Sequence, residues 1–161
     1  MRCATCRCVE SERKPDAAFA AVRGRVEELR RLEACERALG DAYLARCGRA
    51  GGGARWRTLA DRHRGHSERL AARIVELGGR PLADVDDQWI VRGRDPLTAL
   101  LEAEQAALRT YHDHLLDFDP QTMRLVRDRI LAEHEETLAE LTGERDLLPQ
   151  SWSPLTDDPS P

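Results

Sequence analysis

Four long stretches of this 161-residue chain repeat apolar residues at intervals of three and four, a pattern that constrains the fold more than any other feature. This spacing places the apolar side chains on one face of an α-helix, where they can pack into a shared core. The breaks between the stretches hold residues that end or begin helices, such as the Asp119-Pro120 pair. We expect helices at residues 16–47, 54–77, 96–117 and 121–145. The sequence therefore predicts an all-α protein with four helices.

The lengths of the three connections distinguish between arrangements of four helices. Two helices that pack side by side need about 2–8 residues to turn, which fits the first and third connections. The middle connection, residues 78–95, contains 18 residues and can extend over more than about 50 Å. The second helix is only about 36 Å long, so this connection can run the full length of a bundle. The sequence therefore predicts two antiparallel helical hairpins joined by one long crossover.

The segments outside the helices differ from them in composition. We expect a flexible N-terminal tail at residues 1–15, the bundle at 16–148 and a proline-rich C-terminal tail at 149–161. The N-terminal tail contains three closely spaced cysteines, Cys3, Cys6 and Cys8. Such spacing occurs in zinc sites, but no clear fourth ligand accompanies these thiols, so their role stays open.

Composition argues against several classes of function. The net charge of −4 and the sequence pI near 5.8 argue against a nucleic-acid partner or an anionic membrane surface. No stretch approaches the ~20 apolar residues that span a bilayer, and the N-terminus lacks the apolar region of a signal peptide. Five cysteines, an odd number, fit a reducing compartment better than a disulfide framework. We therefore expect a cytoplasmic protein that binds neither nucleic acid nor membrane.

Each apolar stripe is interrupted near its middle by glutamate or histidine. The interrupting residues are Glu36, His63 with His66, Glu104 and His134. Burying a carboxylate costs several kcal/mol unless the group is paired, protonated or bound to a metal. Four interruptions in one bundle therefore require a common explanation.

The spacing of these residues places them at one level of the bundle. Glu36 precedes His66 by 30 residues, and Glu104 precedes His134 by 30. The midpoint of each pair falls on a predicted turn, so within each hairpin the glutamate faces the histidine, about 22 Å from the turn. The two turns lie at opposite ends, so all four residues share one level if the bundle is about 45 Å long. The length expected of the first helix agrees with that value.

The two halves of the chain also correspond to each other with an offset of 68 residues. Glu36 and Tyr43 correspond to Glu104 and Tyr111, and both pairs have the spacing Glu-x6-Tyr. The segment that starts at His66, HSERLA, corresponds to HEETLA in the fourth helix. Matching hairpins are a stronger signal than either motif alone. We expect the two tyrosines in the core, with each hydroxyl bonded to a neighbouring carboxylate.

These features resemble the ferritin-like superfamily, in particular its rubrerythrin-like branch and small uncharacterised bacterial members of that group. The resemblance covers about residues 20–145. It is carried by the Glu-x6-Tyr patterns, the histidines of the second and fourth helices and the long crossover. The segment Gly78-Gly79-Arg80-Pro81 and Trp89 in the crossover are also similar to those members.

The resemblance implies a ferritin-like four-helix bundle with a metal site at its middle. The implied ligands are Glu36, His66, Glu104 and His134. Tyr43 and Tyr111 would lie just outside these ligands, as such tyrosines do in the superfamily. Pairing into a homodimer through helix faces is a further expectation that rests on the resemblance alone.

The chain departs from the two-metal pattern of that superfamily. Metal-binding members carry Glu-x-x-His on the second and fourth helices, whereas this chain has His63 and Leu131 at the glutamate positions. Both carboxylates that would bridge two metals are therefore missing. Glu33, one turn before the glutamate of the first helix, is a partial substitute, while Glu133 points about 100° away from His134 on an ideal helix. One ion is therefore expected in preference to a di-iron centre.

Two interpretations of the polar residues remain open at this point. In the first, a single Fe(II), Mn(II) or Zn(II) ion is bound by the four implied ligands, with His63 as a fifth ligand or a neighbour of the ligands. In the second, the glutamates and histidines form a metal-free hydrogen-bonded layer that fixes helix register in a structural or protein-binding module. We favour metal binding slightly, because four polar interruptions coincide. No residue pattern identifies a substrate or a reaction.

Overall fold

The computed structural model describes residues 17–47, 53–81 and 96–147, and every regular element within them is helical. No strand occurs in these residues, which confirms the predicted all-α class. The first two helices are α1, Ala17–Cys47, and α2, Gly53–Glu76. The third is α3, Pro96–His114, which continues into the 3₁₀ turn Leu115–Asp117. The fourth consists of α4, Pro120–Leu125, the π-helical turn Val126–Leu131 and α5, Ala132–Leu147.

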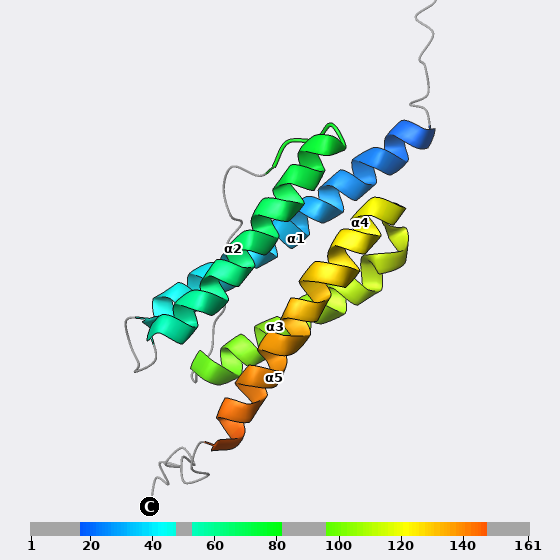
Figure 1. Ribbon diagram of the computed structural model, residues 1–161. Helices are drawn as coiled ribbons and strands as arrows, with labels where there is room; N and C mark the ends of the chain where they lie inside the picture. The colour runs from blue at the N-terminus through cyan, green and yellow to red at the C-terminus, as the bar shows by residue number, and fades with distance from the viewer. Residues whose placement is uncertain (1–16, 48–52, 82–95, 148–161) are drawn as a thin grey trace, which may run out of the picture.

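The helices form two antiparallel hairpins (Figure 1). α1 packs along α2, α3 packs along α5, and α1 also contacts α3. The α1–α2 turn and the α3–α4 turn lie at opposite ends of the bundle (Figure 1). α2 therefore ends at the end of the bundle opposite to the start of α3, and this placement of the two helix ends is the one that the expected crossover requires (Figure 1).

Some sequence predictions concern segments that lie outside the described residues. These segments are the crossover residues 82–95 and the tails at 1–16 and 148–161. The expectations for Trp89 and for the three N-terminal cysteines therefore stay predictions.

The end of α2 shows why two consecutive glycines occur there. Gly78 has a φ of 78°, a left-handed conformation that glycine adopts without a steric penalty. The amide of Gly79 then donates to the carbonyl of Ile74 at 2.8 Å, the bond that closes a helix C-terminus. A Cβ at Gly79 would lie 2.6 Å from a methyl carbon of Val26 on α1. The pair of glycines thus ends α2 close to the predicted end of the second helix, and it also lets the chain pass close to α1.

Asp119 begins the fourth helix and ties it to the first hairpin. Its side chain accepts hydrogen bonds from the backbone amides of Gln121 and Thr122, and Pro120 occupies the first helical turn. This is the N-cap that the Asp-Pro pair predicts. Arg73 of α2 donates to the same carboxylate at 2.8 Å and to the Thr122 hydroxyl at 2.8 Å. Burial would raise the pKa of Asp119, but hydrogen bonds from the Thr122 hydroxyl, the Thr122 amide and Arg73, together with the Arg73 charge, hold it well below its usual value.

Two large apolar clusters occupy the two halves of the bundle, and a small one of Cys35, Leu39 and Ala107 lies in sequence between them. One cluster surrounds the α3–α4 turn and includes Leu29, Leu70 and Ile130. The other lies toward the α1–α2 turn and includes Trp56, Leu97 and Leu141. On every helix, the predicted glutamate or histidine lies in sequence between residues of the two clusters. The polar residues therefore form a layer between two apolar layers.

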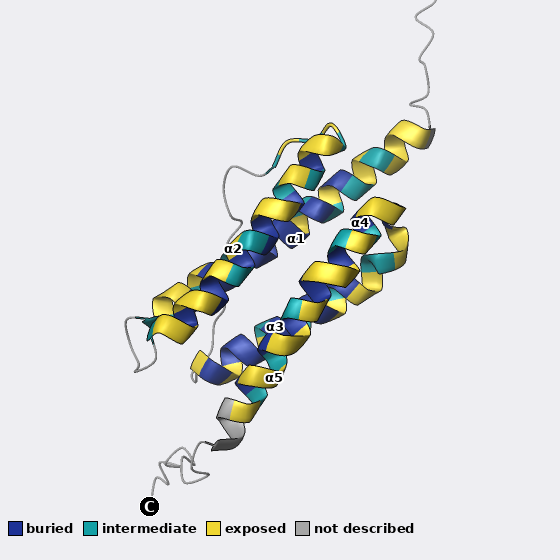
Figure 2. Cartoon of the chain, in the orientation of Figure 1, coloured by how far each residue is buried: buried dark blue, intermediate teal, exposed yellow. Residues whose placement is uncertain are grey.

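The outer faces of the helices are polar. Buried residues follow the inward side of each helix, and exposed residues follow the outward side (Figure 2). None of the described helices is both long enough and apolar enough to cross a membrane.

Candidate metal centre

The polar layer contains all five residues that the sequence singled out as ligands. The side chains of Glu36, His63, His66, Glu104 and His134 are all fully buried, at 0% exposure. They come from α1, α2, α3 and α5, so each of the four helices contributes at least one. Contacts between them, described below, confirm that they share one level of the bundle.

Glu36 is the centre of this group. Its Oε2 lies 2.8 Å from Nδ1 of His63 and 3.1 Å from Nδ1 of His66. Its Oε1 lies 2.8 Å from Nε2 of His134. Three imidazole nitrogens from two helices thus converge on one carboxylate of a third. Each of these four residues offers one donor atom within 4.8 Å of the others, close enough to hold one metal ion.

Glu104 lies behind two of the histidines. Its Oε1 is 2.9 Å from Nε2 of His63, and its Oε2 is 2.5 Å from Nδ1 of His134. These nitrogens are the ones that do not contact Glu36. Glu104 is therefore placed as a partner of two histidines, whereas the sequence suggested it as a direct ligand. Glu36, His63, Glu104 and His134 together form a closed ring of alternating carboxylates and imidazoles.

The two tyrosines connect the hairpins reciprocally. The hydroxyl of Tyr111 donates to Oε1 of Glu36 at 2.6 Å. The hydroxyl of Tyr43 donates to Oε1 of Glu104 at 2.6 Å. Each tyrosine thus bonds to the glutamate of the other hairpin, which confirms the predicted tyrosine–carboxylate contacts. The carboxylates are fixed from outside the ring, which limits how far they can move.

Glu133 is a member of the site that sequence analysis did not assign. Its Oε2 lies 3.0 Å from Nε2 of His66, and Arg62 and Arg69 of α2 lie 4.0 and 3.9 Å from its carboxylate oxygens. Glu133 follows the π-helical turn directly before His134, and the flank to which it points is the one that faces α2. A helix sequence gives the direction of a side chain and not the identity of the neighbouring helix. The sequence feature that comes closest to indicating Glu133 as a site residue is the repetition of glutamate around His134.

Glu33 takes a position different from the one suggested for it. It is buried, at 3% exposure, and its Oε1 accepts a hydrogen bond of 2.9 Å from Arg37. Glu33 is not among the four residues whose donor atoms converge. The partial replacement of a missing bridging carboxylate by Glu33 is therefore not seen in this arrangement.

The π-helical turn Val126–Leu131 ends two residues before Glu133. A π turn adds a residue to one helical turn and rotates everything that follows it, and such turns are frequent at functional sites. Its inward residues Ile130 and Leu131 are buried in the apolar cluster beside the site. The turn therefore sets the rotation at which α5 presents both Glu133 and His134.

The charges of the ring stabilise one another. Burial alone would raise the pKa of Glu36, but the nearby His134 charge and the histidine hydrogen bonds hold it well below its usual value. Burial is likewise outweighed at Glu104, where the hydrogen bond from His134 and the nearby His63 ring lower the pKa to about 2. The same contacts outweigh burial at the histidines, raising the pKa of His134 to about 10 and that of His63 above its usual value. Without an ion, the imidazoles and carboxylates of the ring therefore favour each other's charged forms.

The donor atoms fit a divalent transition-metal ion. Imidazole nitrogens and carboxylate oxygens are the ligands of Zn(II), Fe(II) and Mn(II) in proteins. Nε2 of His63 is buried without a well-directed hydrogen bond, although Glu104 is close to it. Two protons, one each on His63 and His134, would carry the same total charge as one divalent ion. Exchanging these protons for the ion therefore leaves the buried charge balanced.

Comparison of the chain with models of known protein families gives no match, and comparison with curated proteins gives none either. Evidence for function therefore comes from the geometry of the buried residues and from the sequence pattern.

Proposed function

We propose that this protein binds one divalent transition-metal ion at the middle of the bundle. The ligands are Glu36, His63, His66 and His134, and the ion is Fe(II), Mn(II) or Zn(II). The observation that carries this proposal is the convergence of three buried histidines on one buried carboxylate, within 4.8 Å. Burying so many ionisable groups in a helical core is costly, and a bound cation offsets that cost.

The surrounding carboxylates support the same assignment. A histidine that binds a metal through one ring nitrogen usually donates its other N–H to a carboxylate or carbonyl, which fixes the ring. Glu104 is placed to do this for His63 and His134, and Glu133 is placed to do it for His66. Each of the three histidines thus has one nitrogen toward Glu36 and one toward another carboxylate. Such an arrangement orients all three imidazoles in advance of binding.

The resemblance to the ferritin-like superfamily enters this proposal as its structural context. We propose that the chain is a ferritin-like bundle with one ion where two-metal members hold two. His63 and Leu131 at the two bridging positions support one ion over two, because imidazole and leucine cannot bridge metals as a carboxylate does. A divalent ion bound here would supply Lewis acidity at any position that its four protein ligands leave open.

One observation favours a second candidate, a metal-free layer that fixes the packing of the helices. The ring of Glu36, His63, Glu104 and His134 is closed, and two tyrosines complete its hydrogen bonds. A buried polar network with most of its groups paired can specify helix register without a ligand. This candidate predicts that metal and chelator have no effect on stability.

A Co(II) titration of the untagged protein distinguishes the two candidates. We expect absorption bands of a Co(II) ion with nitrogen and oxygen ligands, reaching their limit at about one equivalent. Replacing His66 with glutamine is expected to weaken binding by about a hundredfold or more, because a ligand and its Glu133 contact are both lost. His114→Gln is the matched control, since His114 lies at the α3 end and contacts Glu28 instead of the site. Equal affinity in the two variants would contradict the assignment.

A further inference from the structure

A pocket of about 200 Å³ lies between α1 and α2, and Glu36 is part of its lining. Its other lining residues on α1 and α2 are Arg37, Gly40, Asp41, Leu44, Ala60, Arg64 and Ser67. Glu36 is fully buried, whereas Arg64 and Leu44 are exposed. The pocket thus leads from the surface of the first hairpin to the residue at the centre of the candidate metal site.

The floor of this pocket is built from small residues. Gly40, Ala60 and Ser67 are all buried and lie on the two helices that form its walls. A Cβ added at Gly40 would lie 3.4 Å from the carbonyl oxygen of Ala60 and 3.6 Å from Cβ of His63. A larger side chain at any of these positions would therefore occupy the space between the surface and the histidines.

Larger groups fill three other directions around the site. Along the bundle axis, Tyr43 stacks on His63 with ring centroids 5.2 Å apart, and Trp56 stacks beyond it at 6.1 Å. Tyr111 closes the opposite side, with its ring centroid 5.5 Å from that of His134. Between α2 and α5, Glu133 and Arg62 cover the approach to the buried histidines. The pocket between α1 and α2 is thus less obstructed than these three directions.

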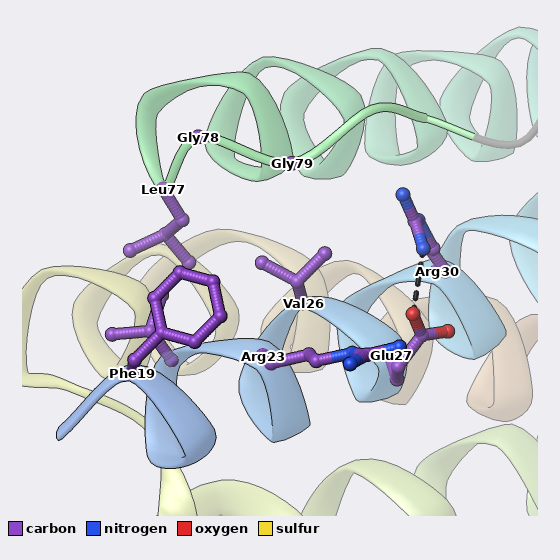
Figure 3. Close-up of a pocket in the computed structure, with 9 residues that line it drawn as sticks. Phe19, Arg23, Val26, Glu27, Arg30, Leu77, Gly78 and Gly79 are labelled. Carbon is purple, nitrogen blue, oxygen red and sulfur yellow. Dashed lines mark hydrogen bonds and ion pairs between the residues drawn. The ribbon is translucent and has the colours of Figure 1, made fainter. Parts of the chain in front are cut away.

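A second pocket of the same hairpin has no such connection. It lies where the N-terminal part of α1 meets the end of α2, lined by Phe19, Val26 and Leu77 with Arg23, Glu27 and Arg30 at its edge (Figure 3). None of the residues that line it belongs to the polar layer. Concavity alone therefore does not distinguish the Glu36 pocket from this one, but the presence of Glu36 in its lining does.

We propose that the pocket between α1 and α2 is the entrance through which small anions reach the metal ion. This inference rests on the proposed function, because the anion binds to an open position of that ion. Four protein ligands leave such a position on Fe(II), Mn(II) or Co(II), which accept more than four. The ion supplies the positive charge that attracts the anion, and the size of the pocket restricts the anion to a few atoms.

The charges at the rim are compatible with an anionic ligand. Arg37 of α1 and Arg64 of α2 line the pocket together with two acidic residues, Asp41 and the buried Glu36. Arg37 is paired with Glu33 at 2.9 Å, and Arg64 with Asp61 at 3.3 Å. The exposed Arg64–Asp61 pair is weak because solvent screens it, so Arg64 remains available to a passing anion. The rim therefore places positive groups along the path without forming a tight anion site of its own.

Azide binding to the Co(II)-loaded protein tests this entrance. Azide perturbs the absorption of Co(II) when it coordinates, so its association rate can be measured by stopped flow. We expect Ser67→Leu to slow association about tenfold or more, equivalent to about 1.4 kcal/mol of added barrier, with Co(II) affinity unchanged. Ala72→Leu is the control on the same helix, because Ala72 is exposed and outside the pocket. Leu44→Trp narrows the exposed rim of the pocket without altering its buried floor, and we expect it to slow azide association as well.

The outcomes separate this inference from the proposed function. Failure of the wild type to bind Co(II) overturns both. Normal Co(II) binding overturns the entrance alone if azide leaves the spectrum unchanged. Azide association at the wild-type rate in both Ser67→Leu and Leu44→Trp also overturns it, because the anion then arrives by another way. Slow association in these two variants, with a normal rate in Ala72→Leu, supports the entrance.

Discussion

Glu36→Gln is expected to abolish tight metal binding and to destabilise the metal-free protein by about 3–5 kcal/mol. Three histidine nitrogens and the Tyr111 hydroxyl lie within hydrogen-bond distance of the Glu36 carboxylate, and all of these groups are buried. A glutamine of the same size has one acceptor oxygen and an amide group that repels the imidazolium protons. Removing one member of a buried charged network leaves the others unpaired, which costs far more than losing a surface contact. Urea unfolding in the presence of chelator measures the effect.

Glu27→Gln is the matched control for this substitution. Glu27 lies on the same helix and pairs with Arg30 at 2.6 Å, but its side chain is 53% exposed. Exposed ion pairs of this kind contribute about 0–1 kcal/mol. If Glu36→Gln costs no more than Glu27→Gln, the ring of carboxylates and histidines does not hold the bundle together.

The stability of the metal-free protein is expected to depend strongly on pH. In the metal-free protein, the pKa of His134 is raised to about 10, so its contribution is complete below the unfolded value near 6.5 and is lost as pH rises toward 10. The pKa of Glu104 is lowered to about 2, so its contribution is complete above an unfolded value near 4.5 and is lost as pH falls toward 2. The metal-free protein is therefore most stable between about pH 4.5 and 6.5.

The metal-bound protein is expected to behave in the opposite way above this range. A metal ion displaces protons from the histidines, so its affinity rises with pH and binding releases protons. Thermal unfolding with excess Zn(II) and with excess chelator should differ little near pH 5 and increasingly from about pH 6 to 9. A difference that does not change with pH would contradict proton–metal exchange at His63 and His134.

Much of the site follows from the sequence because its residues break a regular pattern. On a helical stripe of leucines, Glu36 and His134 stand out, and their spacing from the turns fixes their height along the bundle. Asp119 was likewise predictable, because an aspartate before a proline is a local signal for a helix start. Each of these predictions depends on geometry within one helix or one hairpin, which the residue order determines directly.

The arrangement around the ring does not follow in the same way. Whether Glu104 faces the space beside Glu36 or the far side of the histidines depends on side-chain rotamers and on the packing of α3 against α1. The role of Glu133 depends on which helix lies beside α5. The π-helical turn before Glu133 left no recognisable mark in the periodicity, because one added residue shifts a stripe by only one position. These features arise from tertiary packing, which a single sequence does not encode locally.

The metal content of untagged protein tests the central claim most directly. Wild-type protein and Glu36→Gln are each incubated with Fe(II), Mn(II) or Zn(II), freed of loosely bound ions by gel filtration, and measured by elemental analysis. The proposed site predicts about one equivalent of at least one of these metals in the wild type, and much less in Glu36→Gln. Less than about a tenth of an equivalent of every metal in the wild type would contradict the claim and leave the metal-free layer as the function of the buried residues.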